Sequence, residues 1–254
     1  MIPFSWRFIR LWQRNRDVFF QLWHSEAPGF VAEPLIVLLA MGAGLGAYVG
    51  LINGQSYIAF IAPGIIASYT MYTASFECTY GTFVRMEYQK TYDAIIATPL
   101  NVEDVIAGEI FWGATRSVLT GTAILVLAAA FGLVHSFWAL LIPVLAFLEG
   151  ILFSSLAMLY TSFVPAIYTF NYYYTLFITP MFFFSGVFFP LTSFPKMVQD
   201  LSWLAPLTPV VHLNRALFAG EFYPGLLGAL ALLVGLTAVF FWLALVRMRR
   251  RLLV

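Results

Sequence analysis

Charged residues and cysteine are both scarce in this 254-residue sequence, and each shortage excludes a class of protein. Charged side chains make up 10% of the chain, whereas soluble domains contain about a quarter. Hydrophobic residues make up 61%, so the sequence predicts an integral membrane protein with little room for a soluble domain. The single cysteine, Cys78, excludes an intramolecular disulfide. The net charge of +1 gives no indication of a nucleic-acid partner, and we expect none.

The motifs of several enzyme classes are also absent from the sequence. There is no G-x-x-x-x-G-K-S/T phosphate-binding loop, so an ATP-driven process would need an ATPase on another chain. His24, His135 and His212 do not cluster with carboxylates or cysteine at metal-ligand spacing, so we predict no metal site. No serine occupies a nucleophile elbow. The sequence therefore predicts a protein that is not an enzyme and holds no cofactor of its own.

Six apolar runs, each about 20 residues or longer, predict six transmembrane helices in a single all-α domain covering 1–254. The predicted spans cover about 31–52, 57–76, 107–132, 138–160, 166–185 and 224–246. Lysine and arginine gather before the first span, in the loop between the second and third, and after the last. The positive-inside rule therefore places these three regions, with both termini, in the cytoplasm.

The N-terminal stretch 3–24 combines aromatic and basic residues, Trp6 and Arg7 among them. It is too charged to span a bilayer, and it predicts an amphipathic helix lying in the membrane interface. A simple topogenic flank of the first span is the alternative. The same charges argue against a cleavable signal peptide. Pro28 and Pro34 bracket the start of the first span.

The polar stretch between the second and third spans predicts an amphipathic cytoplasmic helix over 85–98. Its charged residues are Arg85, Glu87, Lys90 and Asp93. Pro99 ends the predicted helix, and Asn101 with Asp104 is placed to cap the next one. A solvated loop face is the alternative interpretation of these charges.

The segment 186–222, after the fifth span, is apolar but repeatedly interrupted by residues that disfavour a helix interior. These residues are Gly186, Pro190, Pro195, Pro206 and Pro209. Non-helical backbone survives at membrane depth only where protein or a water-filled cavity covers it. The segment therefore predicts a helix that bends out of the bilayer, followed by short helices half-sunk at the outer interface.

Two charged residues are predicted inside the membrane, Arg116 in the third span and Glu149 in the fourth. The two spans form an antiparallel hairpin, and a rise of about 1.5 Å per residue gives an axial offset of roughly 7 Å. Two long side chains can close that distance, so we predict an Arg116–Glu149 ion pair. Glu109, two turns from Arg116, is a second candidate partner. A proton or substrate relay is the functional alternative.

The fifth span is unusually rich in aromatic residues. Packing and an aromatic belt at the outer interface explain such a composition without any function. Alternatively, aromatic faces with nearby hydroxyl groups suit an amphipathic ligand such as a glycolipid. The candidate pathway residues on this interpretation are Tyr168, Asn171, Tyr172, Tyr173 and Phe177.

The chain resembles the permeases of type-2 ABC exporters. The resemblance lies in the run Phe-Phe-Ser-Gly-Val-Phe-Phe-Pro at 183–190, in Pro206-Leu207-Thr208-Pro209, and in the following Arg215. A second region, made of 73–86, 89–95 and Gly108-Glu109, resembles the nodulation protein J-like branch more closely. The resemblance covers nearly the whole chain. It is fairly specific for the superfamily and weak for the substrate.

The resemblance implies the permease subunit of an exporter in the bacterial inner membrane. Such permeases dimerise, and we expect a homodimer, with a heterodimer left open. The dimer joins two copies of a cytoplasmic ATPase that binds ATP and Mg²⁺. The helix at 85–98 would be the coupling helix that docks into this ATPase, and 186–222 would form short re-entrant helices. Family members export lipo-oligosaccharides, polysaccharides, lipids or drugs.

A passive channel or a structural subunit of a membrane complex is the competing class. A cation channel requires a filter loop or a carboxylate ring, and 186–222 contains only Asp200 and Glu221. A secondary transporter requires an internal repeat, which the spans do not display. An ATPase encoded in the neighbouring reading frame would favour the exporter.

Overall fold

The computed structural model describes residues 5–52 and 54–253, and this part of the chain is mostly helical. Residues 3–4 of the predicted interface helix lie outside the described residues. Five described stretches are long and apolar enough to cross a membrane, namely Val31–Val49, Tyr57–Tyr88, Val102–Ala130, Phe137–Thr161 and Gly225–Leu252. They match five of the six spans predicted from the sequence.

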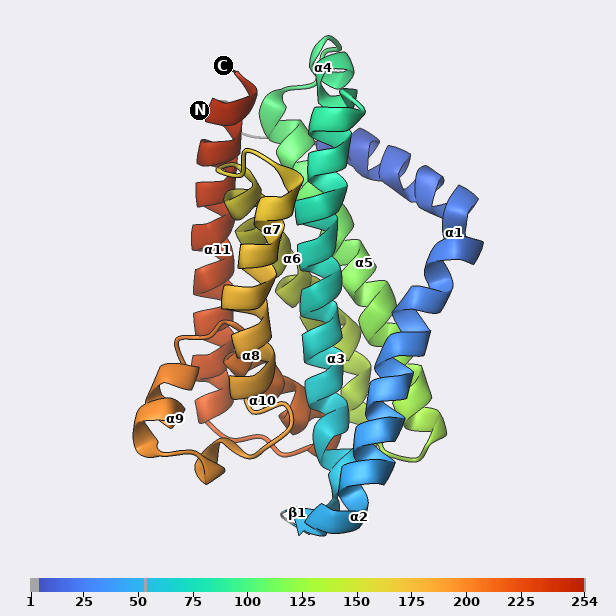
Figure 1. The fold of residues 1–254 in the computed structure, drawn as a ribbon, viewed down its shortest axis with the longest axis vertical. Coiled ribbons are helices and arrows are strands. Elements are labelled where there is room, and N and C mark those ends of the chain that lie inside the picture. The colour runs from blue at the N-terminus through green and yellow to red at the C-terminus, as the bar shows by residue number, and fades with distance from the viewer. Residues whose placement is uncertain (1–4, 53, 254) are drawn as a thin grey trace.

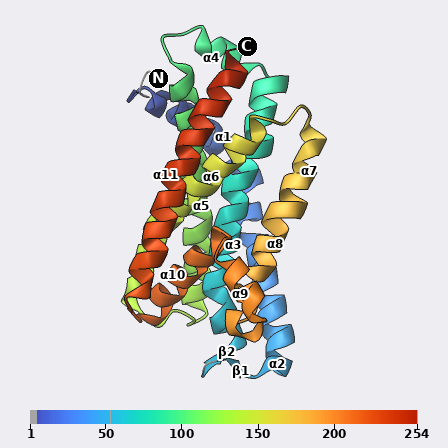
Figure 2. The same cartoon turned by 90° about the vertical axis from the view of Figure 1, so that its left-hand side faces the viewer.

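The long helices run roughly along one axis and form an elongated bundle (Figure 1). Its members are α1 (Phe8–Leu39), α3 (Tyr57–Phe76), α5 (Val102–Ala130), α6 (Ile142–Thr161) and α11 (Gly225–Leu252). The start of α1, the short helix α4 (Thr91–Ile96) and the last turns of α11 lie at one end, here named the α4 end. The opposite end, the hairpin end, holds α2 (Gly46–Val49) and a two-stranded antiparallel sheet of β1 (Leu51–Ile52) and β2 (Gln55–Ser56) (Figure 2).

The first helix differs from the prediction of an interface helix followed by a separate span. Helix α1 continues through Pro28 and Pro34 and changes direction along its length, as Figure 1 shows in dark to lighter blue. Proline removes a backbone hydrogen bond and bends a helix without necessarily ending it. A π-helical segment, η1 (Ala40–Leu45), extends α1 toward α2.

Helices α5 and α6 form the predicted antiparallel hairpin, and small residues bring them close together. A Cβ atom added at Gly150 of α6 would lie 2.6 Å from Ala114 Cα on α5, a distance that forces one helix to move. Close approach through small residues is typical of membrane helices. The 3₁₀ turn η4 (Phe137–Leu141) opens α6, and Asn101 precedes α5, where its N–H donates to Asp104 Oδ2 at 3.3 Å as predicted.

The predicted fifth span is divided into shorter pieces in the structure. The 3₁₀ turn η5 (Ile167–Thr169) leads into α7 (Phe170–Tyr173), the π-helical turn η6 (Tyr174–Ile178) and α8 (Thr179–Phe184). Figure 1 shows α7 and α8 in line with one another, parallel to the bundle axis. This segment is not among the five continuous helices of membrane-crossing length, so its role as a span stays a prediction.

The segment 186–222 contains the short helices that the sequence predicts. Gly186 has φ +82°, a conformation that favours glycine, and it follows the end of α8. The 3₁₀ turn η7 (Leu191–Ser193) after Pro190 leads to α9 (Lys196–Ser202) and α10 (Leu207–Ala219). Pro206 and Pro209 lie at the start of α10, where proline is tolerated because the first N–H groups have no partner within the helix. Both helices lie toward the hairpin end (Figure 1).

Candidate functional site

The segment that follows α3 is not the continuous 85–98 helix predicted from the sequence. Two π-helical stretches, η2 (Glu77–Gly81) and η3 (Val84–Tyr88), prolong α3, and α4 begins only at Thr91. Lys90 separates η3 from α4 with a left-handed backbone at φ 51°. The wide turns and this break reorient the chain, so Arg85 faces the bundle while α4 projects at the α4 end (Figure 1).

The four predicted coupling residues therefore divide into two groups. Lys90 and Asp93 are exposed beside and on α4. Glu87 is half-buried, and its carboxylate lies 3.6 Å from Lys90 Nζ and 2.8 Å from Arg251 Nη2. Arg85 points inward instead. Of the four, only Lys90 and Asp93 are placed to contact another protein without rearrangement.

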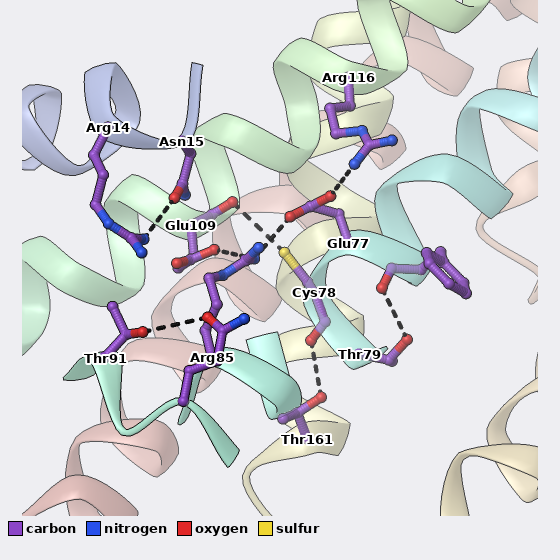
Figure 3. A network of polar contacts seen from close by, with 12 residues as sticks. Arg14, Asn15, Glu77, Cys78, Thr79, Arg85, Thr91, Glu109, Arg116 and Thr161 are labelled. Atoms are coloured by element: carbon purple, nitrogen blue, oxygen red, sulfur yellow. Dashed lines mark hydrogen bonds and ion pairs between the residues drawn. The ribbon is translucent and has the colours of Figure 1, made fainter. Parts of the chain in front are cut away.

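A buried network of four charged residues connects this segment to α5 (Figure 3). Glu77 accepts from Arg85 at 2.7 Å through Oε1 and from Arg116 at 2.6 Å through Oε2. Arg85 also donates to Glu109 Oε2 at 2.5 Å. Glu77 is 3% exposed and Glu109 is fully buried. Two positive and two negative charges balance in this network, as buried charges require.

The predicted Arg116–Glu149 ion pair is wrong. Arg116 contacts Glu77, and Glu149 Oε2 lies 2.6 Å from the Thr70 hydroxyl on α3. Glu109 pairs with Arg85 rather than with Arg116. Counting residues from a turn fixes the height of each side chain along its helix, but it does not fix the direction in which that side chain points. Glu149 therefore contacts α3 instead of Arg116.

Arginines of the last turn of α11 hold the α4 end together. Arg251 donates to Val164 O at 2.7 Å and to the Thr161 carbonyl at the end of α6, and its other Nη contacts Glu87. Arg249 Nη1 lies 3.0 Å from Glu103 in the first turn of α5. The predicted last span ends at about residue 246, whereas α11 continues through these arginines to Leu252. Sequence reasoning missed their contacts because a basic tail carries no signal of its partners.

The start of α1 packs against α5 instead of lying free. Trp12 Nε1 donates to Thr115 Oγ1 at 2.8 Å, and Ser5 N donates to Asp104 Oδ1 at 2.5 Å. A Cβ atom at Gly108 would lie 2.8 Å from Leu11 Cβ, so this glycine admits α1 close to α5. The predicted aromatic surface of this helix therefore serves at least partly for packing within the chain.

Two adjoining cavities lie between α1 and the bundle. One of about 370 Å³ is lined by Arg14 and Phe19 of α1 and by Arg85, and one of about 490 Å³ by Glu33, Tyr69, Tyr72 and Tyr174. Both are lined by Phe76 and Arg116, so they meet at these side chains. Aromatic rings with hydroxyl groups and a few charged groups are typical of sites for ligands that are partly apolar.

The predicted pathway residues of the fifth span lie elsewhere. Tyr168, Asn171, Tyr172 and Phe177 are exposed on the outside of the single chain, and Tyr173 is buried against Tyr160. Of the aromatic residues in this span, Tyr174 is the one that lines the 490 Å³ cavity. Sequence reasoning missed Tyr69 and Tyr72 because they lie in an apolar run that predicts only a span.

The bundle of apolar helices and its buried charged network define a polytopic membrane protein. Residues 7–222 match the family model described as ABC-2 type transporter, and the chain belongs to this family.

The chain is also similar to individual members of the family. It is 39% identical over 255 residues to nodulation protein J of Rhizobium meliloti, covering 98% of this chain and 95% of that protein. Its identity to nodulation protein J of Sinorhizobium fredii is 37%, with the same coverage. It is 27% identical over 213 residues to the inner membrane transport permease YadH of Escherichia coli, covering 83% of this chain and 82% of that protein.

Proposed function

We propose that this chain is the permease subunit of an ATP-driven exporter in the bacterial inner membrane. It would move an amphipathic substrate such as a lipo-oligosaccharide, a glycan, a lipid or a drug. Two copies of a separate cytoplasmic ATPase would bind ATP and Mg²⁺ and supply the energy. Membership of the ABC-2 transporter family supports this role. The observation that carries the proposal is the ion-paired connection between the α4 segment and the helix bundle.

Helix α4 would be the surface that docks into the ATPase. It projects at the end where α1 begins and α11 ends, which the positive-inside rule assigns to the cytoplasm. Lys90 and Asp93 give this surface one charge of each sign, exposed to a partner. Tyr92 is buried beneath them and anchors α4 to the bundle. Burial raises the pKa of Tyr92, which therefore stays a neutral anchor.

A push on α4 would reach the membrane part of the chain through the charged contacts. Arg85 connects η3 to Glu109 on α5, and Glu87 connects η3 to Arg251 on α11. Because α5 and α6 pack closely at Gly150, these helices would move as one body. Contiguous packed elements with fixed ion pairs are the physical means by which a displacement at one site reaches another.

The moving body would change the access to the cavities beside α1. Arg116 takes part in the network and also lines both cavities, so a shift of η3 would move a side chain in the cavities where a substrate would bind. In a homodimer of six-span subunits, the exposed faces of α1 and of the α7–α8 segment would face the partner. Tyr168, Tyr172 and Phe177 would then line a pathway between protomers. The helices α9 and α10 would close its outer end as re-entrant helices.

The test is the rate of ATP hydrolysis by the ATPase of the neighbouring reading frame, measured alone and with this chain in lipid nanodiscs. We expect a stable complex whose turnover rises with one substrate class. Lys90→Glu and Asp93→Lys should each weaken the complex about tenfold, the effect of a lost or reversed pair worth roughly 1.4 kcal/mol. The matched controls are Lys196→Glu and Asp200→Lys on α9, exposed charges at the other end of the bundle. Equal weakening of the complex by the α4 variants and by the α9 controls would overturn the proposal. An ATPase turnover that does not change when this chain is present would also overturn it.

A further inference from the structure

A cavity of about 610 Å³ opens at the hairpin end, on the side opposite α4. It lies between the β1–β2 hairpin, the start of α3, the loop before η4, α10 and the loop that follows α10. Its volume is within the range of small-molecule sites, about 300–1,000 Å³. The cavities beside α1 share none of its lining residues, so it is a separate site.

Arg215 of α10 lines this cavity and carries an incompletely satisfied positive charge. Its Nη2 donates to the carbonyl oxygens of Gly186 and Val187, and its guanidinium lies 4.0 Å from the ring centroid of Phe60. Its Nε is buried and has no hydrogen-bond partner in the part of the chain that the structure describes. Burial lowers the pKa of Arg215 to about 10, and among the described residues no ion pair of Arg215 with a carboxylate is present. A buried guanidinium that faces only carbonyl dipoles and a ring lacks its counter-anion.

The rest of the cavity wall offers neutral hydrogen-bonding groups. Gln55 and Ser56 of β2 line it, together with His212 and Tyr223, whose Nδ1 and hydroxyl lie 3.4 Å apart. Burial first, and then the charge of Arg215, lower the pKa of His212, so this ring is neutral at neutral pH. Glu221, which carries a carboxylate and is therefore not one of the neutral groups, also lines the cavity and can accept hydrogen bonds from hydroxyl groups. Such a wall suits a ligand with many hydroxyl groups.

We propose that this cavity binds a hydroxyl-rich solute carrying one oxyanion group, the chemistry of an acidic sugar. The oxyanion accepts hydrogen bonds from Arg215, and the hydroxyl groups bond to the neutral side chains around it. The binding rests on the cavity alone. The further idea that this cavity lies at the exit of an export route, with an acidic glycan as the exported substrate, rests on the proposed function.

The experiment is equilibrium dialysis of radiolabelled glucuronate, glucose and acetate against the full chain in nanodiscs, with no ATPase present. Glucuronate has both the carboxylate and the hydroxyl groups, and each of the other probes has one of them. We expect glucuronate to bind about tenfold more tightly than glucose or acetate, because hydrogen bonds between charged groups are the stronger ones. Equal binding of glucuronate and glucose, or no binding of glucuronate, overturns the proposal.

A pair of variants at Ser56 tests the charge without removing Arg215, whose loss would also release the carbonyls of Gly186 and Val187. Ser56 is exposed at the N-cap of α3, where aspartate and asparagine are both favoured. Ser56→Asp should bind glucuronate about tenfold more weakly than Ser56→Asn, because its carboxylate repels the oxyanion, while the two variants should bind glucose equally. Lys196→Gln removes an outer positive charge away from the cavity and should have no effect. Equal glucuronate binding by the two Ser56 variants refutes the role of charge. Because no ATPase is present, these outcomes are independent of the exporter test.

Discussion

Replacing Glu77 with glutamine removes one negative charge from the buried network and keeps the size of the side chain. Glu77 is 3% exposed and contacts Arg85 at 2.7 Å and Arg116 at 2.6 Å. After the change, Arg85 keeps Glu109 as its carboxylate partner, and Arg116 faces a neutral amide in place of the Glu77 carboxylate. Removing one partner of a buried ion pair costs about 3–5 kcal/mol. The glutamine oxygen still accepts one hydrogen bond, so we expect a loss of about 3 kcal/mol in the free energy of unfolding.

The assay is equilibrium unfolding in mixed micelles with increasing SDS. The double variant Glu77→Gln with Arg85→Gln restores the charge balance, so its loss should be smaller than the sum of the single losses by about 1 kcal/mol or more. Asp200→Asn, at an exposed position on α9, is the control and should change stability by less than about 0.5 kcal/mol. Additive losses, or a single-variant loss no larger than the control, would refute the argument that the network is energetically coupled.

Two further predictions concern contacts of α11 and α3. Arg251→Gln should cost about 1–2 kcal/mol of stability and reduce the stimulation of the partner ATPase, since it breaks the half-exposed pair with Glu87 and weakens the bonds to the end of α6. Arg251→Glu combined with Glu87→Arg should recover part of the stimulation. The control Arg250→Gln, at an exposed position, should change neither stability nor stimulation. Stimulation by the double variant no higher than that by either single variant would contradict the role of the Arg251–Glu87 pair. Glu149→Gln should preserve stability within about 0.5 kcal/mol. The Thr70 hydroxyl lies 2.9 Å from the Ile66 carbonyl and 2.6 Å from Glu149, and it has one hydrogen to donate. If that hydrogen goes to Ile66, Glu149 is the donor to Thr70 and is therefore protonated, and the amide of glutamine can donate in its place. A loss of several kcal/mol on unfolding in SDS would show that Glu149 is charged instead.

Much of the helical architecture follows from hydropathy and turn chemistry. The second span was predicted at 57–76, and α3 covers Tyr57–Phe76. The cap of α5 was predicted from Asn101 and Asp104, whose preferences are local, and the predicted start of the last span at about 224 agrees with α11, which begins at Gly225. Gly186 marked the end of α8 for the same reason, because its left-handed backbone favours glycine.

The errors arise where the outcome depends on rotation about a helix axis or on packing between distant segments. Pro28 was expected to separate two helices, but the structure keeps one bent helix. The predicted helix at 85–98 is interrupted at Lys90, whose backbone is left-handed, and Arg85 faces the bundle from the π-helical segment before it. No local pattern in the sequence distinguishes a helix that ends from one that bends.

The sequence by itself determined that this is a helical membrane protein, and it predicted which regions share one side of the membrane. These properties depend on composition and on residues near one another in the chain. The tertiary structure decided the partners of the charges: Glu77 with Arg85 and Arg116, and Glu87 with Arg251, 164 residues away. A buried charge must find an opposite charge, but only the rotation and packing of the helices determine which one it meets.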